Sequence, residues 1–321
     1  MTFLSIILAL VLEQIKALPA RRIALWQTQY ADFLERQFNG GERQHGTIAW
    51  VLGVALPALL VLLLHAAVDA VHPLPGFIVA VAVLYLTMGL RQFSHYFTDI
   101  QMALRMGEID RARRLLEEWR GRSAARLNAT EIARLAIEQG IVATHRHVFA
   151  PLLWFVVLGP AGAVLYRLSL CVMQCWGATA PPDADKSVVA SPFARFAQQA
   201  FQVLDWLPAR LTAATFAIVG DFEDAIYCWR TQASQWAQAV PAEQGADMAS
   251  GILLSSAAGA LGVRLGLPLP DETGFDARPE LGLGDDADVE HLQSAVGLVW
   301  RALVLCLLLL ALLTVASWVG P

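Results

Sequence analysis

Residues 302–319 read ALVLCLLLLALLTVASWV and contain no charged side chain. A helix needs about 20 mostly apolar residues to cross the hydrocarbon core of a bilayer. This stretch therefore predicts a membrane-spanning helix close to the C-terminus, with Arg301 directly before it. Such a segment places the chain among integral membrane proteins, and the composition of the whole chain agrees with that class.

Apolar residues are in excess over the whole chain. They occupy 56% of the 321 positions and charged residues only 16%, whereas soluble domains have roughly 45–50% and about 25%. The mean hydropathy is +0.51. These values exclude a disordered chain, a nucleic-acid-binding protein and an ordinary soluble enzyme. Four cysteines, without a CxxC pair, are too few for a disulfide framework.

Further apolar runs are predicted to lie in the membrane. Ile48–Leu64 and Pro73–Leu90 are separated by a short link, so they are predicted to form a helical hairpin. Val148–Tyr166 is another uncharged run, and Arg167 ends it. Thr2–Leu12 is short, has no positive n-region and no small-residue cleavage site, and is therefore predicted to be a retained membrane segment rather than a signal peptide.

Arginine placement predicts the orientation. The segment 91–146 is rich in arginine: Arg91, Arg105, Arg111, Arg113, Arg114, Arg120, Arg122, Arg126, Arg134 and Arg146. By the positive-inside rule this segment is cytoplasmic, in a multi-pass protein of the bacterial inner membrane. If Val148–Tyr166 crosses outward, another segment must return before the last span. Leu211–Gly220 is too short to cross, and Met248–Val263 is rich in small and polar residues. Either one of them re-enters the membrane or Val148–Tyr166 does not fully span it, and both alternatives stay open.

Hydropathy and charge divide the chain into an N-terminal membrane segment and hairpin at 1–90, a cytoplasmic helical segment at 91–147, a membrane segment at 148–177, a region of linker, amphipathic or re-entrant helices and acidic loop at 178–291, and a C-terminal transmembrane helix at 292–321. The soluble part is also predicted to be helical. Asn128-Ala-Thr-Glu131 is typical of a capping box, and no strand-type alternation stands out. The predicted fold is an all-α polytopic integral membrane protein with a cytoplasmic Arg-rich helical segment.

One polar cluster stands directly before the Val148 run. It reads Thr144-His145-Arg146-His147 and could bind a phosphate or polarise a carbonyl; the alternative is anchoring at the membrane interface. Histidines two residues apart do not face the same side of a helix, so a metal site here would need ligands from elsewhere.

Single charged residues give the other candidates. Arg167 stands in apolar sequence, where a charge indicates a functional site by default; the alternative is an arginine that reaches the membrane edge. Asp205 and Arg210 flank Pro208 and could form a structural ion pair. Trp154, in the Val148 run, completes the set of candidate ligand-binding residues.

Several segments, taken in order, resemble the adenosylcobinamide-phosphate synthase family of cobalamin biosynthesis (CobD/CbiB), with its related AmpE branch. They are Leu34–Gly41, Gly107–Arg114, Ile132–Glu138 (family R-x-AIE), Ala150–Trp154 with Gly162–Arg167 (family APLFW and YR), Leu204–Thr212 (family PARLT) and Ala257–Gly266 (family GALGVRLG). The resemblance implies a multi-spanning membrane fold. It also implies an enzyme activity that uses ATP to join a corrinoid carboxylate to an aminopropanol-type amine. That chemistry is expected to need Mg²⁺ held by oxygen ligands.

The chain departs from the family pattern at polar positions. Where the family reads EN-x-x-D before APLFW, Gly140–Phe149 contains neither an acid nor an asparagine. Where the family reads NTLDSM after YR, Leu168–Met173 again contains neither Asn nor Asp. The packing motifs are kept and the polar motifs are not, and AmpE-like members resemble the chain in this respect.

The lost acids favour a non-catalytic relative: a sensor, regulator or partner-binding membrane protein with no catalytic or metal residue assigned. The alternative is an active cobinamide-phosphate synthase that uses ATP and Mg²⁺, whose remaining metal-ligand candidates are Asp99, Asp205, Asp221, Glu223 and Asp224. A small-molecule transporter has only the broken spans in its favour. The expected partners are membrane lipid and a corrinoid or another membrane protein, without nucleic acid. Two or more carboxylates that converge on a polar pocket near His147 and Arg167 would favour the enzyme, and a pocket of only arginine, histidine and apolar groups would count against it.

Overall fold

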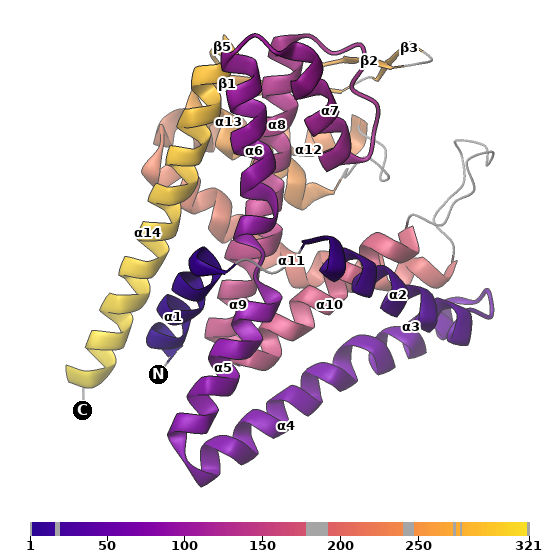
Figure 1. Ribbon diagram of the computed structural model, residues 1–321, viewed down its shortest axis with the longest axis vertical. Coiled ribbons are helices and arrows are strands. Elements are labelled where there is room, and N and C mark those ends of the chain that lie inside the picture. The colour runs from indigo at the N-terminus through magenta and orange to yellow at the C-terminus, as the bar shows by residue number, and fades with distance from the viewer. Residues whose placement is uncertain are drawn as a thin grey trace. The chain divides into compact units, whose positions relative to one another are not determined.

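The computed structural model describes residues 2–16, 20–177, 192–239, 247–271, 274–276 and 278–319. Helices dominate this part of the chain, which confirms an all-α membrane protein (Figure 1). The chain divides into two compact units, which are interleaved in sequence: unit 1 comprises residues 1–92 and 146–207, and unit 2 comprises residues 93–145 and 208–321. The linker expected at Ala178–Ser191 lies outside the described residues.

Unit 1 is entirely helical in its described part. It contains α1 (Thr2–Ile15), α2 (Ala20–Phe38), α3 (Arg43–Trp50), the π-helix η1 (Val51–Ala55), α4 (Leu56–Val71), α5 (Pro73–Thr87), α9 (Ala150–Leu158), α10 (Pro160–Gly177) and the first part of α11 (Pro192–Val219). The π-helix η2 (His145–Phe149) stands at the boundary between the two units.

Helix α10 is the centre of unit 1, where it packs against α2, α4, α5 and α9. Its last turn is held by Trp176, whose indole N–H donates to the carbonyl of Ala31 at 3.1 Å. Tyr30 donates to the carbonyl of Gly53 at 2.7 Å. A side chain at Gly53 would collide with Leu34, because a Cβ there would lie 2.3 Å from Leu34 Cδ1. Glycine therefore allows η1 and α2 to approach closely.

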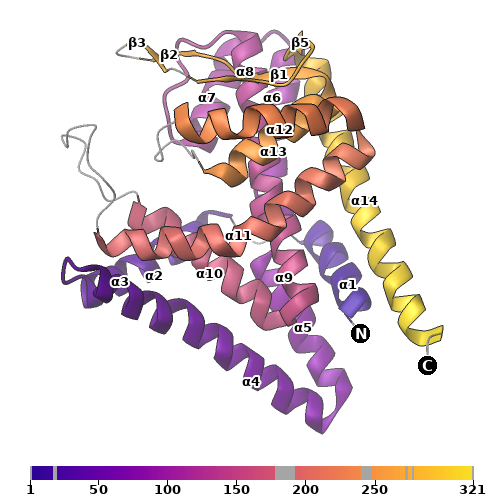
Figure 2. The same ribbon diagram turned by 180° about the vertical axis from the view of Figure 1, so that it is seen from behind.

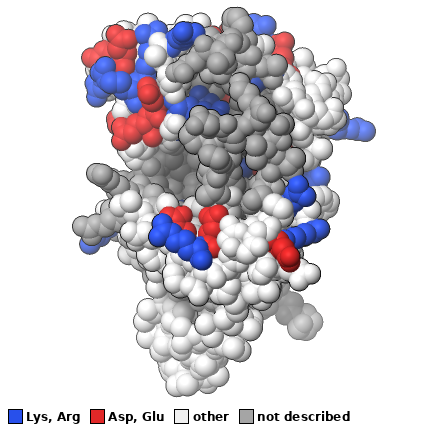
Figure 3. Space-filling view, turned by 90° about the vertical axis from the view of Figure 1, so that its right-hand side faces the viewer, with Lys and Arg blue, Asp and Glu red and all other residues white. Residues whose placement is uncertain are grey.

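The expected hairpin is present. Helices α4 and α5 meet at His72, whose side chain accepts from the backbone N–H of Leu74 at 3.1 Å, and Figure 1 shows the two helices diverging from this turn. The continuous helix Arg43–Val71 is long and apolar enough to cross a membrane, and only 22% of its most apolar window is buried in protein. On the face drawn in Figure 3, the end with the α4–α5 turn shows no charged side chain.

Unit 2 combines helices with short strands. It contains most of α6 (Leu90–Arg105), α7 (Ile109–Arg120), α8 (Ala129–Thr144), the second part of α11, α12 (Phe222–Ala239), α13 (Met248–Leu261), β1 (Val263–Gly266), β2 (Leu269–Asp271), β3 (Gly274–Asp276), β4 (Glu280–Leu281), β5 (Asp285–Asp286) and α14 (Val289–Val319). One sheet has the order β4-β1-β5, with β4 antiparallel and β5 parallel to β1; β2 and β3 form an antiparallel pair.

The strands lie in the segment where the sequence predicted an acidic loop. Their pairing is short: Leu265 stands opposite Leu281 in β4, and Val263 opposite Asp285 in β5. Strands of two to four residues leave no alternating pattern long enough to be recognised in a sequence. In this arrangement β1 contacts both α8 and α13.

Helix α13 is a core helix of unit 2. Nearly all of its residues are buried, and it lies along α12 (Figure 2). Two glycines allow this close approach, because a Cβ at Gly251 would lie 2.4 Å from the carbonyl oxygen of Ala233 and one at Gly259 would lie 2.5 Å from that of Asp224. Burial in protein thus accounts for the apolar composition of Met248–Val263, the segment considered for re-entry.

The apolar run Val148–Tyr166, expected as one membrane segment, is broken in the structure. Helix α9 ends before Gly159, which has φ of +64°, and α10 begins at Pro160. The absent side chain of Gly162 lets α10 fold back on α9, since a Cβ there would lie 2.1 Å from the carbonyl oxygen of Trp154. Hydropathy averaged over a window of sequence does not reveal this turn, because Gly159 and Pro160 stand among apolar residues.

The long apolar helix that includes α9 runs instead from Ala129 to Leu158. It is one of three helices in the described part of the chain that are long and apolar enough to cross a membrane, with Arg43–Val71 and Val289–Ser317. The share of its most apolar window that is buried is 56%, against 17% for the C-terminal helix. The C-terminal helix therefore presents its apolar side chains outward, as lipid requires, while α8 serves largely as a core element.

The packing of α12 on α13 gives a testable prediction. Replacing Gly259 by valine should destabilise unit 2 by about 1–3 kcal/mol or more, because its Cβ would collide with backbone. Gly297→Ala is the matched control, since no atom lies within 4 Å of a Cβ there, and it should be neutral or stabilise the helix by up to about 1 kcal/mol. Thermal unfolding of the detergent-solubilised chain measures both; equal melting temperatures would contradict this packing.

Candidate functional site

The π-helical turn η2 separates α8 from α9. Such turns are often found at functional sites because they change the direction of side chains within one helix. Here the two histidines have different partners: His145 is fully buried and shares a hydrogen bond of 3.0 Å with the hydroxyl of Thr212 in unit 2, while His147 is bonded to Arg167 in unit 1.

Arg167 is a buried cation in unit 1. Its residue exposure is 8%, and its Nη1 lies in hydrogen-bond contact with Nδ1 of His147. Because a guanidinium can only donate, His147 Nδ1 accepts, and the ring proton is assigned to Nε2. Within the part of the chain that the structure describes, no carboxylate forms an ion pair with Arg167. A buried charge without an opposite charge is costly, so this position suits an anionic ligand.

A second polar pair lies beside it. The hydroxyl of Tyr166 donates to Oδ1 of Asp205 at 2.7 Å, and both residues are buried. The Tyr166 ring packs on Phe201 with centroids 5.5 Å apart. Trp154 packs against the same cluster and donates to the carbonyl of Leu204 at 3.2 Å. The start of α11 is thereby tied to α9 and α10.

The structure gathers only some of the candidate residues. In unit 1, His147 contacts Arg167, and Asp205 and Trp154 contact the cluster of the neighbouring Tyr166. Only one of these four candidates is a carboxylate, so they do not by themselves meet the criterion of two carboxylates. Arg146 stands on η2 in the same unit and is half-buried, whereas His145 and the half-buried Arg210 belong to unit 2.

Sequence reasoning missed Tyr166 as a functional residue. Its signal was its place directly before Arg167, where a hydroxyl in an apolar helix needs a partner when it is buried. The sequence predicted that Asp205 pairs with Arg210. In the structure, Oδ1 of Asp205 accepts a hydrogen bond from Tyr166.

Metal ligands are sparse in the described residues, which contain no group of three or more His, Cys, Asp and Glu side chains placed to hold an ion. Among the acids considered as remaining ligands, Asp221 accepts from the backbone N–H of Asp224 at 3.1 Å. This bond belongs to the first turn of α12, so the acidic cluster there has a structural use at the helix start.

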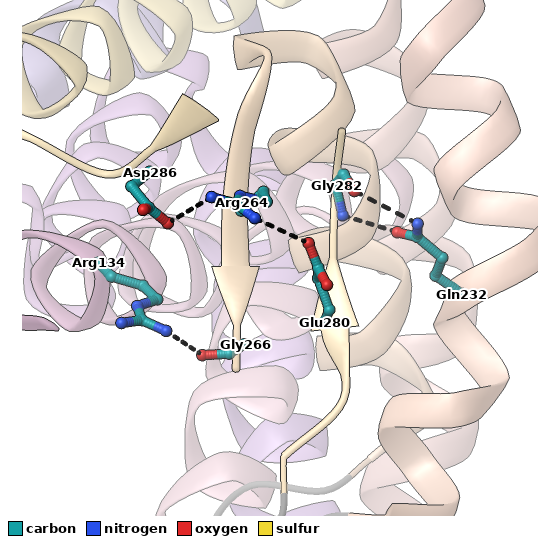
Figure 4. A network of polar contacts seen from close by, with 7 residues as sticks. All are labelled: Arg134, Gln232, Arg264, Gly266, Glu280, Gly282 and Asp286. Carbon is teal, nitrogen blue, oxygen red and sulfur yellow. Dashed lines mark hydrogen bonds and ion pairs between the residues drawn. The ribbon is translucent and has the colours of Figure 1, made fainter. Parts of the chain in front are cut away.

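A different polar cluster, which the sequence analysis did not select, lies in unit 2. It brings together the segments Ile132–Glu138 and Ala257–Gly266. Glu138 accepts from the backbone N–H of Gly266 at 2.8 Å, and Arg134 donates to the carbonyl of Gly266 at 3.2 Å. Figure 4 shows Arg134 reaching from α8 to the end of β1.

The rest of this cluster fixes the strands. Arg264 lies between Asp286, at 3.0 Å, and Glu280, at 3.7 Å, and so joins β1 to both neighbouring strands (Figure 4). Gln232 of α12 accepts from the N–H of Gly282 at 2.7 Å and donates to its carbonyl at 3.4 Å. These contacts attach the sheet to the helices of unit 2.

Comparison with known proteins gives consistent matches. A family model described as CobD/Cbib protein matches residues 6–299. The Cobalamin biosynthesis protein CobD of Stutzerimonas stutzeri is 35% identical over 96% of this chain and 96% of its own length. The protein of that name from Chromobacterium violaceum is 36% identical over 72% of this chain and 69% of its own, and that of Mycobacterium tuberculosis is 29% identical over 62% and 60%. No solved structure shows a significant match.

The Tyr166–Asp205 bond can be tested by a matched pair of variants. Tyr166→Phe removes one hydroxyl from a buried carboxylate and should cost about 1.5–3 kcal/mol of stability. Tyr227→Phe is the control, because Tyr227 is 55% exposed. Thermal unfolding in detergent should show a lower melting temperature for the first variant alone; a Tyr166→Phe protein as stable as the parent would show that this bond contributes little.

Proposed function

Because the chain belongs to the CobD/CbiB family, we propose that it acts in cobalamin biosynthesis as an amide-forming synthase of the adenosylcobinamide-phosphate synthase type. The comparisons support this function over a non-catalytic regulator, since the relatives that match most of the chain are named for cobalamin biosynthesis. The regulatory, AmpE-like hypothesis rested on the missing acids of the polar motifs. It gains no support from the relatives.

The observation in the structure that carries the proposal is the buried Arg167 of unit 1. A corrinoid carboxylate, or the phosphate that activates it, would supply the opposite charge that this guanidinium lacks within the described chain. Arginine binds carboxylate and phosphate through two parallel hydrogen bonds, which fix orientation as well as charge. His147 would hold the guanidinium in place through the nitrogen that accepts from it.

Each residue can then be given a task in amide formation. The carboxylate must first receive the terminal phosphoryl group of ATP, with release of ADP. The amine then attacks the carbonyl carbon and forms the C–N bond, the C–O bond to phosphate breaks, inorganic phosphate leaves, and the amine nitrogen loses a proton to water or phosphate. Arg167 would stabilise the negative charge on oxygen during this attack. Tyr166 and Asp205 would hold α10, which carries Arg167, against α11.

Mg²⁺ is proposed as a companion of the phosphate groups. Mg²⁺ often takes one or two protein carboxylates and completes its shell with phosphate oxygens and water. Asp205 is the carboxylate in the unit 1 cluster, and the described residues offer no larger group of ligands. The described residues therefore do not make a metal site by themselves.

The location follows from the same proposal. The apolar surfaces of α4 and α14 support residence in a membrane, and the arginines of 91–146 support a cytoplasmic side for that segment, where ATP is available. Membrane lipid and a corrinoid are the proposed partners.

Complementation tests the function. The chain should restore growth that depends on de novo cobalamin in a bacterium that lacks its own cobinamide-phosphate synthase. Failure to restore growth, with the protein present in the membrane fraction, would overturn the proposal in favour of a non-catalytic role.

Variants place the site. Arg167→Ala and His147→Ala should abolish rescue, with kcat/KM lowered by about 100-fold or more in membranes assayed for ATP-dependent amide formation. Arg167→Lys should recover only part of the activity, because an ammonium cannot make the paired bonds of a guanidinium. Arg111→Ala is the control, since Arg111 is exposed and pairs with Glu108 at the start of α7. Full activity of Arg167→Ala would remove Arg167 from the site.

A further inference from the structure

A group of buried donors lies in unit 2, outside the site proposed above. Arg134 of α8 is 6% exposed and Arg278, before β4, is 8% exposed. Trp236 of α12 is 4% exposed and lies under Arg278, whose Cζ is 4.9 Å from the indole centroid. Glu138, also buried, is the acceptor that the cluster contains.

The hydrogen bonds of Glu138 are already used. One carboxylate oxygen accepts from the N–H of Gly266 and the other from Nη2 of Arg278. Arg134 makes one bond, from Nη1 to the carbonyl of Gly266. Within the described part of the chain, Nε of Arg134, Nη1 of Arg278 and Nε1 of Trp236 have no acceptor. Buried donors are almost always satisfied in folded proteins, so an acceptor is expected here.

The charge balance points to the sign of that acceptor. Two guanidinium groups, which repel each other, share one buried carboxylate, Glu138. The neighbouring Arg264 does not add to the excess, because it is more exposed and is paired with Glu280 and Asp286. Glu131 and Asp286 also act on Arg134, but neither forms an ion pair with it in the described chain. One positive charge therefore remains buried.

The backbone frame holds this cluster in one arrangement. Gly266 has φ of +71°, and a Cβ there would lie 1.9 Å from the carbonyl oxygen of Pro279. Only glycine fits, and both its N–H and its carbonyl are committed to α8, through Glu138 and Arg134. The donors are thus fixed before a ligand arrives.

We propose that Arg134, Arg278 and Trp236 form an anion site in unit 2 that takes a phosphate group. A phosphate presents at least three acceptor oxygens, enough for the three unsatisfied donors, whereas a carboxylate presents two. This site goes beyond the proposed function: it does not require Arg167 and would hold a phosphate ester at a second place in the chain. A lipid phosphate and a free phosphate ester share this chemistry.

The first experiment uses inorganic phosphate and the full chain in detergent. Phosphate should raise the melting temperature relative to chloride at equal ionic strength, and titration followed by phosphorus NMR should give saturable binding. Arg134→Gln should weaken binding by about tenfold or more, as expected for a lost charged hydrogen bond. Arg111→Gln is the control, because Arg111 is an exposed arginine of α7 that pairs with Glu108, and it should bind like the parent.

Further variants keep the test decisive. Trp236→Phe keeps an aromatic ring under Arg278 and removes only the donor, so it should fold and bind phosphate about fivefold more weakly. Arg167→Ala separates this site from that of unit 1. Binding that survives Arg134→Gln and Trp236→Phe but is lost in Arg167→Ala would overturn the proposal, as would binding unchanged in all variants.

The source of the phosphate is resolved by two further probes. Glycerol phosphate and ATP represent free esters, and vesicles of phosphatidylglycerol against phosphatidylcholine represent lipid. Stabilisation by the esters that is sensitive to Arg134→Gln assigns a soluble ligand, while a response confined to phosphatidylglycerol and equally sensitive assigns a lipid headgroup. Insensitivity of both to Arg134→Gln counts against the site.

Discussion

A buried carboxylate, that of Glu138, joins three parts of unit 2 that lie far apart in the sequence. It accepts from the backbone of β1 and from the guanidinium of Arg278, and its helix α8 also contacts α13 and α14. Burying a carboxylate is costly unless it is paired and hydrogen-bonded. Gly266 is the residue that meets this carboxylate, and a Cβ at its position would collide with the carbonyl oxygen of Pro279. The end of β1 and the buried Arg278 are therefore tied to α8 through Glu138.

Unit 1 handles its buried polar groups differently. Arg167 is in hydrogen-bond contact with His147, and the carboxylate of Asp205 accepts from the hydroxyl of Tyr166. Within the described chain no carboxylate forms an ion pair with Arg167, so this guanidinium suits an anionic ligand. An enzyme that binds anions benefits from such an arrangement, because a cation already paired with a protein carboxylate would have to give up that partner first.

Local signals account for what the sequence predicted. The capping box is confirmed, with Asn128 and Glu131 bonded reciprocally at 2.9 and 2.8 Å, because its bonds join residues three apart. The α4–α5 hairpin and the C-terminal helix were visible because hydropathy alone defines them. Contacts between distant residues were not visible: nothing near Glu138 in the sequence announces Arg278, and nothing near Tyr166 announces Asp205. The break at Gly159 was missed because its flanking residues are apolar.

The preference for a non-catalytic protein came from counting acids in local motifs, and the structure shows why that count is a weak test. Charged residues far apart in the sequence, such as Glu138 in the R-x-AIE segment and Arg278 outside every quoted motif, meet only after folding. The binding of phosphate depends on donors, and arginines supply these without any acidic pattern. Mg²⁺ can take most of its ligands from substrate phosphates and water. A chain can therefore lose the acids of two short segments and keep the cationic surroundings that a phosphate-dependent amide synthase needs.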